Sequence, residues 1–391
     1  MDFILTIFIF ILIISSLVLV HEFGHFIAAK IFNIPVQEFA IGFGKSIYSR
    51  KYKDTVYKIN ILPLGGYVNL EGETDSHKFG GFRDKPFFVK FVVLTAGVLM
   101  NLVFASVLLN VFLILNNWQF NSIPKLVNYD FSNVEKQIEA LPLRIIDVQK
   151  GSNADGILES SELIISLNNN YYSSFSEFKN LLLQNIGKEV SIGLIKLDTF
   201  EIYTKLLFLD KEKIINDGVL GVKFSSNNTL VDNQIFLLKY PANVLSGFNL
   251  TLDIFVFQAK ALWSIFSNAF QTGEFTEVTD AVGGLPAITN QVNQIVTFRI
   301  FEVLIPFTAF ISISLAFINI LPIPALDGGQ LLIYSIEALI RKKIPDKVIN
   351  YINLSGFVFL LFLGLLINIK DIIRLDLFKS LFNFINTLFG R

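Results

Sequence analysis

The chain has 391 residues, of which 52% are hydrophobic and only 17% charged, and its mean hydropathy is +0.57. Globular proteins carry roughly 25% charged residues, so this balance indicates an integral membrane protein. The net charge of −1 creates no field that would attract nucleic acid, and the absence of cysteine excludes disulfides, thiol catalysis and zinc–thiolate sites.

Four long apolar segments follow one another along the chain, each with the roughly 20 residues that a membrane-spanning helix needs. They cover residues 3–32, 87–115, 300–321 and 348–367. A signal peptide is the alternative for the first segment, but its start lacks basic residues and no cleavage motif follows. A further stretch, residues 245–270, is apolar but contains Asp253 and Lys260, which favours a helix on the membrane surface or beside the bundle over a span.

Lysine and arginine cluster in the loops after the first and third apolar segments, at residues 30–90 and 341–347. Basic loops stay on the cytoplasmic side of a membrane, so both loops are predicted to be cytoplasmic. The polar region 118–243 and the N-terminus then lie outside, and the C-terminus does too if there are four spans.

Residues 55–73 of the first loop alternate between apolar and polar side chains and then turn through Pro63 and Gly65–Gly66. The pattern predicts a β-hairpin against the membrane face, and an amphipathic surface loop is the alternative.

Between residues 123 and 210, strand, turn and helix signals follow the order seen in PDZ domains, with a helix beginning at a capping box formed by Ser174 and Glu177. The glycine-containing carboxylate-binding loop of PDZ domains is missing before Arg144. The sequence therefore leaves two interpretations open: a domain that binds a free C-terminus, and a domain that filters substrates by size.

The sequence HEFGH, residues 21–25, directly follows the first apolar stretch. On a helix, His21 and His25 lie one turn apart on one face and can hold a Zn²⁺ ion, with Glu22 placed to take a proton from the attacking water. The alternatives are a chance match and a helix-end cluster without metal. Ionisable groups are costly at membrane depth and usually mark function, which favours the metal site.

A catalytic zinc commonly has three protein ligands. The remaining histidine, His77, lies in a polar stretch typical of an exposed loop, so a carboxylate is the better candidate. Asp327 follows an apolar segment broken by Pro322 and Pro324, and irregular backbone at membrane depth is tolerated around an internal site. The alternative is that Asp327 only caps the next helix.

Taken together, these motifs resemble the site-2 protease family of intramembrane zinc metalloproteases, in particular the bacterial regulated-intramembrane-proteolysis type with a PDZ domain. The matching stretches, in the family's order, are HEFGHFIAAK (21–30), FAIGFG (39–44), LPLGGYV (62–68), AGVLMN (96–101) and NILPIPALDGG (319–329). The chain departs from the family at Val98 and Leu285, where proline is usual.

The resemblance implies roles for eight residues. The Zn²⁺ ligands would be His21, His25 and Asp327, and Glu22 would be the general base and then the proton donor. The residues that contact substrate would be Asn319, Gly65, Gly66 and Tyr67, the last three in a hairpin that pairs with an unwound substrate segment. The implied partners are the lipid bilayer, single-span membrane proteins such as anti-sigma factors or signal-peptide remnants, and an upstream site-1-type protease.

We therefore expect a polytopic α-helical membrane protein with about four transmembrane helices, a membrane-associated β-hairpin and one extracytoplasmic PDZ-like α+β domain. The expected parts are an N-terminal membrane part with the HExxH helix (1–118), the PDZ-like domain (119–212), a linker with a juxtamembrane helix (213–297) and a C-terminal membrane part with the LDG motif (298–391). The expected location is the bacterial inner membrane, with the active site near the cytoplasmic side.

Two other functions fit parts of the sequence. A catalytically silent membrane scaffold with a PDZ-like domain should have lost Glu22 or a metal ligand, and all of them are present. A transporter with broken helices should have a second broken span in an opposing repeat, and the sequence has none.

Overall fold

The structure, a computed structural model, describes residues 2–73, 81–160, 162–172, 174–196, 202–214, 218–224, 234–274, 278 and 281–375. The chain divides into two compact units. Unit 1 comprises Met1–Leu109 and Ile254–Arg391, and unit 2 comprises Asn110–Asp253. The expected PDZ-like domain, residues 119–212, falls within unit 2, and its boundaries stay predictions.

The described residues of unit 1 are helical apart from one pair of long strands. Its helices, two of which continue into unit 2, are α1 (Asp2–Ile31), α2 (Phe87–Leu115), α4 (Ser246–Thr272), α6 (Leu285–Phe298), α7 (Leu304–Ile320), α8 (Asp327–Ile340) and α9 (Asp346–Arg374). Short 3₁₀ turns, η1 (Phe82–Asp84) and η3 (Phe301–Val303), precede α2 and α7. Helix α1 packs against α6 through Ile13, Leu17, Val292 and Val296.

Five helical segments among the described residues have the length and hydropathy of a membrane span. They are Asp2–Ile31, Phe87–Leu115, Ser246–Thr272, Phe301–Ile320 and Asp346–Arg374. Four of them coincide with the apolar segments identified from the sequence. The fifth, Ser246–Thr272, contains the stretch that was expected to lie on the membrane surface or beside the bundle. The number of spans and their orientation therefore stay predictions.

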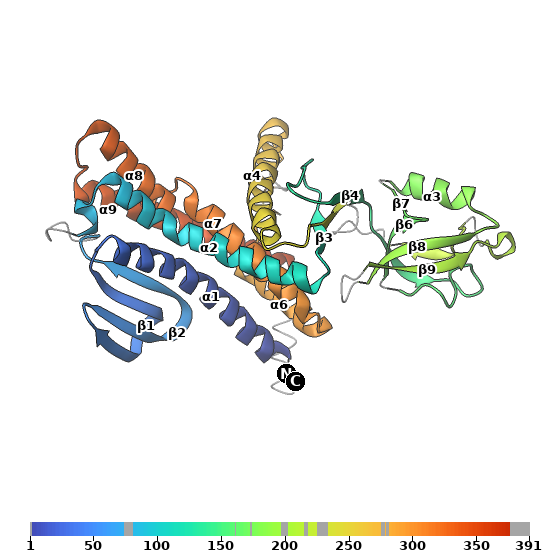
Figure 1. Ribbon diagram of the computed structural model, residues 1–391, viewed down its shortest axis with the longest axis horizontal. Coiled ribbons are helices and arrows are strands. Elements are labelled where there is room, and N and C mark those ends of the chain that lie inside the picture. The colour runs from blue at the N-terminus through green and yellow to red at the C-terminus, as the bar shows by residue number, and fades with distance from the viewer. Residues whose placement is uncertain are drawn as a thin grey trace. The chain divides into compact units, whose positions relative to one another are not determined.

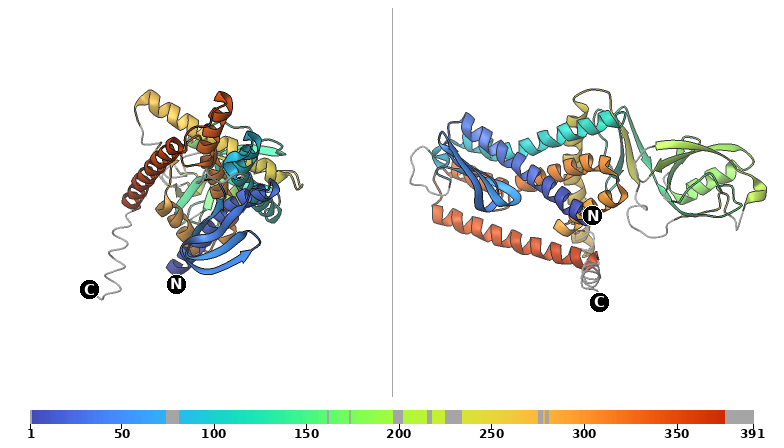
Figure 2. Two further views of the ribbon diagram at one scale, coloured as in Figure 1. Left: turned by 90° about the vertical axis from the view of Figure 1, so that its left-hand side faces the viewer. Right: turned by 90° about the horizontal axis from the view of Figure 1, so that it is seen from below.

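A β-hairpin is present, but its strands and its turn differ from those that the sequence pattern predicted. Strand β1 (Val36–Tyr52) pairs antiparallel with β2 (Thr55–Leu70), and their connection lies at Lys53–Asp54. Pro63 to Gly66, the expected turn, is instead a bend inside β2. Phe39 therefore has a β2 partner on each side, Tyr57 and Val68, and β2 lies along α1 (Figures 1 and 2).

The described residues of unit 2 form two sheets and the helix α3, besides the short 3₁₀ turn η2 (Lys211–Lys213) and the ends of α2 and α4. The larger sheet has the order β10 (Val222–Phe224), β5 (Leu143–Val148), β6 (Glu162–Leu167), β8 (Glu189–Lys196) and β9 (Ile202–Phe208), and β7 (Asn170–Tyr171) pairs with β6. The smaller sheet has the order β3 (Gln119–Pro124), β11 (Ile235–Lys239) and β4 (Lys136–Ala140). Helix α3 (Phe175–Gln184) begins as expected, because the Ser174 side chain accepts a hydrogen bond from the Glu177 N–H.

Asp253, one of the two charges that argued against a span over residues 245–270, has partners within unit 2. Its carboxylate accepts hydrogen bonds from the Tyr129 hydroxyl (3.1 Å), the Ser132 N–H (2.8 Å) and the Ser132 hydroxyl (2.9 Å). A buried charge is tolerated when its lone pairs are satisfied, so Asp253 ties α4 to the segment before β4.

Glu162 forms a buried charge network in the larger sheet. Its carboxylate accepts hydrogen bonds from the Lys205 ammonium (2.6 Å) and the Tyr203 hydroxyl, while Lys205 is itself half-buried. Burial raises the pKa of Glu162, but the hydrogen bonds from Lys205 and Tyr203 outweigh it and hold the pKa below the ordinary value of 4.5. The ionised form therefore stabilises the folded unit.

We expect Glu162→Gln to destabilise unit 2 by about 1–3 kcal/mol at pH 7, because Lys205 loses its charged acceptor. The stabilisation is fully present above pH 4.5 and is lost as pH falls through the lowered pKa, so variant and wild type converge in acid. Hydrogen exchange of β6 and β8 amides in the full chain under urea measures this. Lys239→Gln, which breaks the exposed pair with Glu135, is the control and should cost under about 0.5 kcal/mol.

Candidate metal centre

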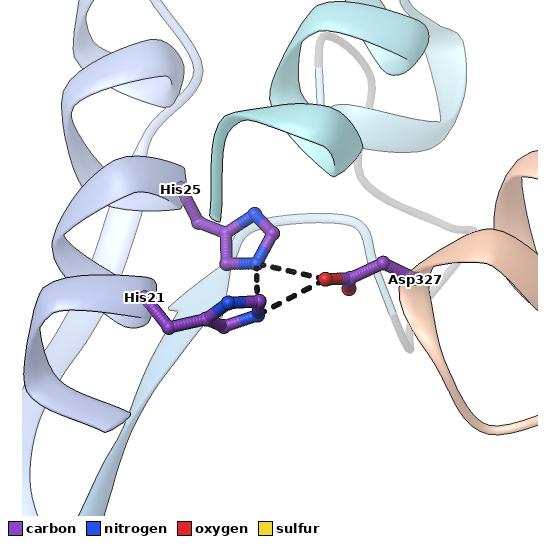
Figure 3. Close-up of side chains that lie close together, drawn as sticks. All are labelled: His21, His25 and Asp327. Carbon is purple, nitrogen blue, oxygen red and sulfur yellow. Dashed lines mark hydrogen bonds and ion pairs between the residues drawn. The ribbon is translucent and has the colours of Figure 1, made fainter. Parts of the chain in front are cut away.

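Three side chains from the two ends of the chain converge in unit 1 (Figure 3). The Nε2 atoms of His21 and His25 lie 3.2 Å apart, and the Oδ2 atom of Asp327 lies 3.0 Å from the first and 3.3 Å from the second. Both histidines are buried, with 7% and 9% of their surface exposed. The three donor atoms therefore form a nearly equilateral triangle.

The helical periodicity of α1 explains the position of the histidines. Residues 21 and 25 are four apart, so their side chains lie one above the other on the face of α1 that α2 covers. Gly97 of α2 makes this close packing possible. A Cβ atom at Gly97 would come within 2.5 Å of the His25 Nε2 atom and 2.7 Å of the His21 Cε1 atom.

Polar groups of α2 orient both imidazole rings. The His25 Nδ1 atom lies 2.8 Å from the Val93 carbonyl oxygen, and only a protonated Nδ1 can donate to it. That tautomer leaves the Nε2 lone pair of His25 free for a metal. The His21 Nδ1 atom lies 3.3 Å from the Asn101 side-chain amide, whose Oδ1 atom has no partner among the described residues. Rotating this amide by 180° presents Oδ1 to the Nδ1–H of His21, which satisfies both groups.

The turn between α7 and α8 delivers Asp327. Helix α7 ends at Ile320, and Pro322 and Pro324 prevent it from continuing. Gly328 and Gly329 let α8 begin against this turn, since a Cβ atom at Gly328 would overlap the carbonyl oxygens of Ile320 and Leu321. Asp327 is the first residue of α8, and its carboxylate contacts the histidines. The interpretation of Asp327 as only a helix cap is therefore wrong.

The donor set fits a zinc ion. Zn–N and Zn–O distances of about 2.0–2.1 Å place tetrahedral ligand atoms about 3.3 Å apart, close to the edges of the observed triangle. Two neutral imidazoles and one carboxylate are ligands that zinc prefers, and three protein ligands leave a fourth position open, as in catalytic zinc sites.

Glu22 follows His21 on α1 and is bound by the hairpin. Its Oε2 atom accepts a hydrogen bond from the Val68 N–H at 3.0 Å. Val68 lies in the part of β2 that pairs with β1 on one side only, so this edge of β2 faces Glu22. The contact places the proposed general base and the hairpin in one hydrogen-bonded unit.

Of the four residues expected to contact substrate, one lies beside the triangle and three lie in the hairpin. The Asn319 Nδ2 atom is 3.5 Å from the His21 Nε2 atom, so Asn319 belongs to the site. Gly65 lies in the β2 bend against Val18, and Gly66 pairs with Ile41. The Tyr67 hydroxyl donates to Glu38 (2.9 Å), so its hydroxyl is already engaged. His77 lies outside the described residues, and the substrate roles of the other four stay predictions.

Sequence reasoning assigned no role to Val68, Val93, Gly97 or Asn101. Gly97 and Asn101 lie in the stretch AGVLMN, whose spacing of four mirrors that of the two histidines. This matching spacing is the signal from which a helix face packed against the two histidines could have been predicted. The Val68 N–H and the Val93 carbonyl are backbone groups, so no residue type could reveal them.

Unit 2 also has a surface that the sequence interpretation did not anticipate. Strand β10 pairs with β5 on one side and forms the edge of the larger sheet, and Phe224 of β10 contacts Phe175 and Phe178 of α3, with ring centroids 5.9 Å apart in both pairs. Val219, Leu220 and Gly221, with φ +70° at the glycine, lead into this edge.

The carbonyl groups of these three residues face inward. The Val219 oxygen accepts from the Asn153 side chain (2.7 Å), and those of Leu220 and Gly221 accept from the Ala154 and Gln149 N–H groups. A glycine-containing loop beside an edge strand and a helix is thus present, but it follows the domain's helix in the chain. Both interpretations of this domain therefore stay open.

Comparisons with known proteins agree with the geometry. The model of "Peptidase family M50" matches residues 9–363. The "Putative zinc metalloprotease CPE1693" of Clostridium perfringens is 31% identical over 92% of this chain and 96% of its own length. The "Putative zinc metalloprotease FN1322" of Fusobacterium nucleatum is 29% identical over 95% and 99%.

Among solved structures, the PDZ domain of the SdrC-like protein from Listeria innocua is 19% identical and covers 22% of this chain and 97% of its own. Its TM-score of 0.20 is too low to carry an argument about the fold.

We expect Gly97→Ala to weaken zinc binding at least about tenfold, because the new methyl group would displace both imidazole rings. Metal content and competition with a chelator measure this on purified protein. Gly364→Ala in α9, where an added Cβ meets no atom within 4 Å, is the matched control and should retain the wild-type affinity. Equal zinc affinity in the two variants would contradict the assigned packing.

Proposed function

Because the chain belongs to peptidase family M50, the site-2 protease family, and is a zinc metalloprotease, we propose that it is an intramembrane endopeptidase that cuts the transmembrane segments of single-span membrane proteins. The observation that carries this proposal is the triangle of His21, His25 and Asp327, built by an apolar helix and by a turn that interrupts another. A metal site with an open position inside helices of span length suits a peptide bond in the same environment.

In this proposal, His21 and His25 would hold zinc through their Nε2 atoms and Asp327 through its carboxylate. Zinc bound there supplies a Lewis acid that polarises a carbonyl group and lowers the pKa of water to about 7. Val93 and Asn101 keep the protons of both histidines on Nδ1, so that Nε2 stays available at each ring.

Glu22 moves the proton. The Val68 N–H occupies its Oε2 atom, so Oε1 takes the proton from the attacking water and later gives it to the leaving amide nitrogen. The hydrogen bond to Val68 also fixes the carboxylate orientation, which reduces the reorganisation needed for each transfer.

A transmembrane helix hides its carbonyl groups in intrahelical hydrogen bonds, so the substrate must unwind before hydrolysis. Glu22 already accepts the Val68 N–H, so the remaining backbone groups of this β2 edge, around Gly66, would be the partners of the unwound backbone, which would add as a strand. Asn319, near His21, is placed to contact the backbone of that strand.

The physiological setting extends this proposal. The substrates would be anti-sigma factors or signal-peptide remnants already trimmed by an upstream site-1-type protease. The site would lie near the cytoplasmic face of the bacterial inner membrane, supported by the basic residues of the loops at 30–90 and 341–347. Unit 2 would then lie outside, where trimmed substrates present their new ends.

We also propose that unit 2 binds a free C-terminus between β10 and α3. The inward-turned carbonyls of Val219 and Leu220 leave the N–H groups of Leu220 and Gly221, which share their peptide planes, on the opposite side. That arrangement suits a carboxylate, and the edge of β10 suits an added strand. A domain that only filters substrates by size needs no such groove. A measurement of peptide binding therefore distinguishes the two interpretations.

Glu22→Gln should abolish cleavage of a labelled single-span substrate in detergent and retain about one zinc per chain, because the amide cannot take up a proton. Removing zinc with a chelator should stop the wild type, and adding zinc should restore it. Zinc bound by both proteins without cleavage by either would point to a wrong substrate. Absence of metal from both would refute the site assignment.

A fluorescent peptide with an apolar last residue and a free carboxylate should bind the full chain with micromolar affinity, and the same peptide amidated should bind at least about tenfold more weakly. Gly221→Val should remove the difference, because a branched side chain is strained at φ +70° and would overlap Ser152. Equal binding of the two peptides would favour the size filter.

A further inference from the structure

Helix α8 carries more than the metal ligand on its inner face. Asp327, Gln330, Tyr334 and Glu337 are spaced by three, four and three residues, so they form one stripe along the helix. Tyr334 and Glu337 are buried, with 5% and 8% of their surface exposed. Glu337 lies about 15 Å along the axis from Asp327, so any tilt of α8 at Glu337 also moves the carboxylate of Asp327.

Arg83 of η1 binds the far end of this stripe. Its Nη2 atom lies 3.3 Å from the Glu337 carboxylate and donates to the Ile344 carbonyl oxygen at 2.6 Å, and its Nη1 atom lies 2.6 Å from Asp346. The Ile344 N–H in turn donates to Glu337 at 2.7 Å. The side chains of Arg83 and Glu337 are both over 90% buried, and one guanidinium thus joins α8, the following turn and the start of α9.

Tyr334, one turn closer to Asp327, is held by neighbours of Arg83. The Lys90 ammonium lies 4.4 Å from the centre of its ring, and the Phe82 ring meets it edge-on at 5.9 Å. Phe82, Arg83 and Lys90 therefore hold the stripe of α8 at two levels. This stretch runs directly into the part of α2 that orients the histidines.

Residues 82–101 thus contact both halves of the metal centre. Val93, Gly97 and Asn101 set the imidazoles, while Phe82, Arg83 and Lys90 set the helix that carries Asp327. The turn before Asp327 is irregular and includes Ala325 at φ +74°, so α8 needs support beyond that turn. We propose that Arg83, through its buried pair with Glu337, is a positioning residue that sets the distance between Asp327 and the two histidines.

The buried contacts of Arg83 differ from a nearby exposed ion pair. Lys343 and Asp84 join the same two segments at 3.0 Å, but their side chains are 63% and 36% exposed. Water screens such a pair and the long lysine side chain adapts, so it cannot fix a position. A buried guanidinium that donates to Glu337 and the Ile344 carbonyl and lies beside the Asp346 carboxylate can. Lys343→Met is therefore the matched control.

The inference rests on the proposed zinc ligands, and the experiment tests the two separately. The full chain is purified in detergent, its zinc affinity is measured by chelator competition, and its melting temperature is measured with and without zinc. We expect Arg83→Met to weaken zinc binding about 10- to 100-fold and to reduce the rise in melting temperature that zinc causes. Lys343→Met should stay within about twofold of the wild type in affinity.

Three outcomes decide the matter. The Arg83→Met variant could have a lower melting temperature but wild-type zinc affinity and the full rise in melting temperature on zinc addition. That result would overturn the proposal and leave Arg83 a purely structural role. If Arg83→Met does not fold, Arg83→Lys, which keeps the charge but loses the fork, must still weaken zinc binding at least about threefold, and unchanged affinity overturns the proposal. A wild type that binds no zinc would instead refute the ligand assignment itself.

Discussion

The structure of unit 1 depends on bringing three polar donors together inside an apolar bundle. His21 and His25 come from the first helix and Asp327 from a turn more than 300 residues later. Without a cation, a carboxylate beside two buried imidazoles is a costly arrangement in lipid. Each donor is therefore supported by neighbouring groups, the rings by the Val93 carbonyl and Asn101 and the carboxylate by the two glycines that follow Asp327. Binding of zinc turns the electrostatic cost into a source of stability.

Helix α2 is central to this arrangement, although it contributes no ligand. Its backbone and small residues contact the histidines, and the stretch before it contacts α8. Helices in lipid gain little from apolar burial between them, so close packing at small residues and a few polar contacts determine their mutual positions. Gly97 and Asn101 supply both kinds of contact within one turn. Helix α2, although it supplies no metal ligand, therefore determines where the ligands of the other helices lie.

The chemistry was predictable from the sequence because it rests on helical spacing and on rare residue types. His21, Glu22, His25 and Asp327 stand out in a chain with three histidines, and the structure brings the three expected donors within contact distance. The hairpin was only partly predictable, because β2 bends at Pro63 to Gly66 and pairs on both sides of β1, which depends on contacts with α1. The Arg83–Glu337 pair joins residues 254 positions apart and carries no local pattern. The loop at Val219–Gly221 follows α3 in the chain, and the sequence analysis looked for such a loop only before Arg144.

The hydrogen bond between the Val68 N–H and Glu22 has one further consequence. The hairpin edge proposed to receive an unwound peptide and the proposed general base share one hydrogen bond, so a shift of either would move the other. A polypeptide that pairs badly with β2 would pull the carboxylate out of line and be spared, whereas one that pairs well would keep it aligned. In the proposed mechanism, discrimination between substrates would thereby be exercised at the chemical step, after entry, through the alignment of a single oxygen atom.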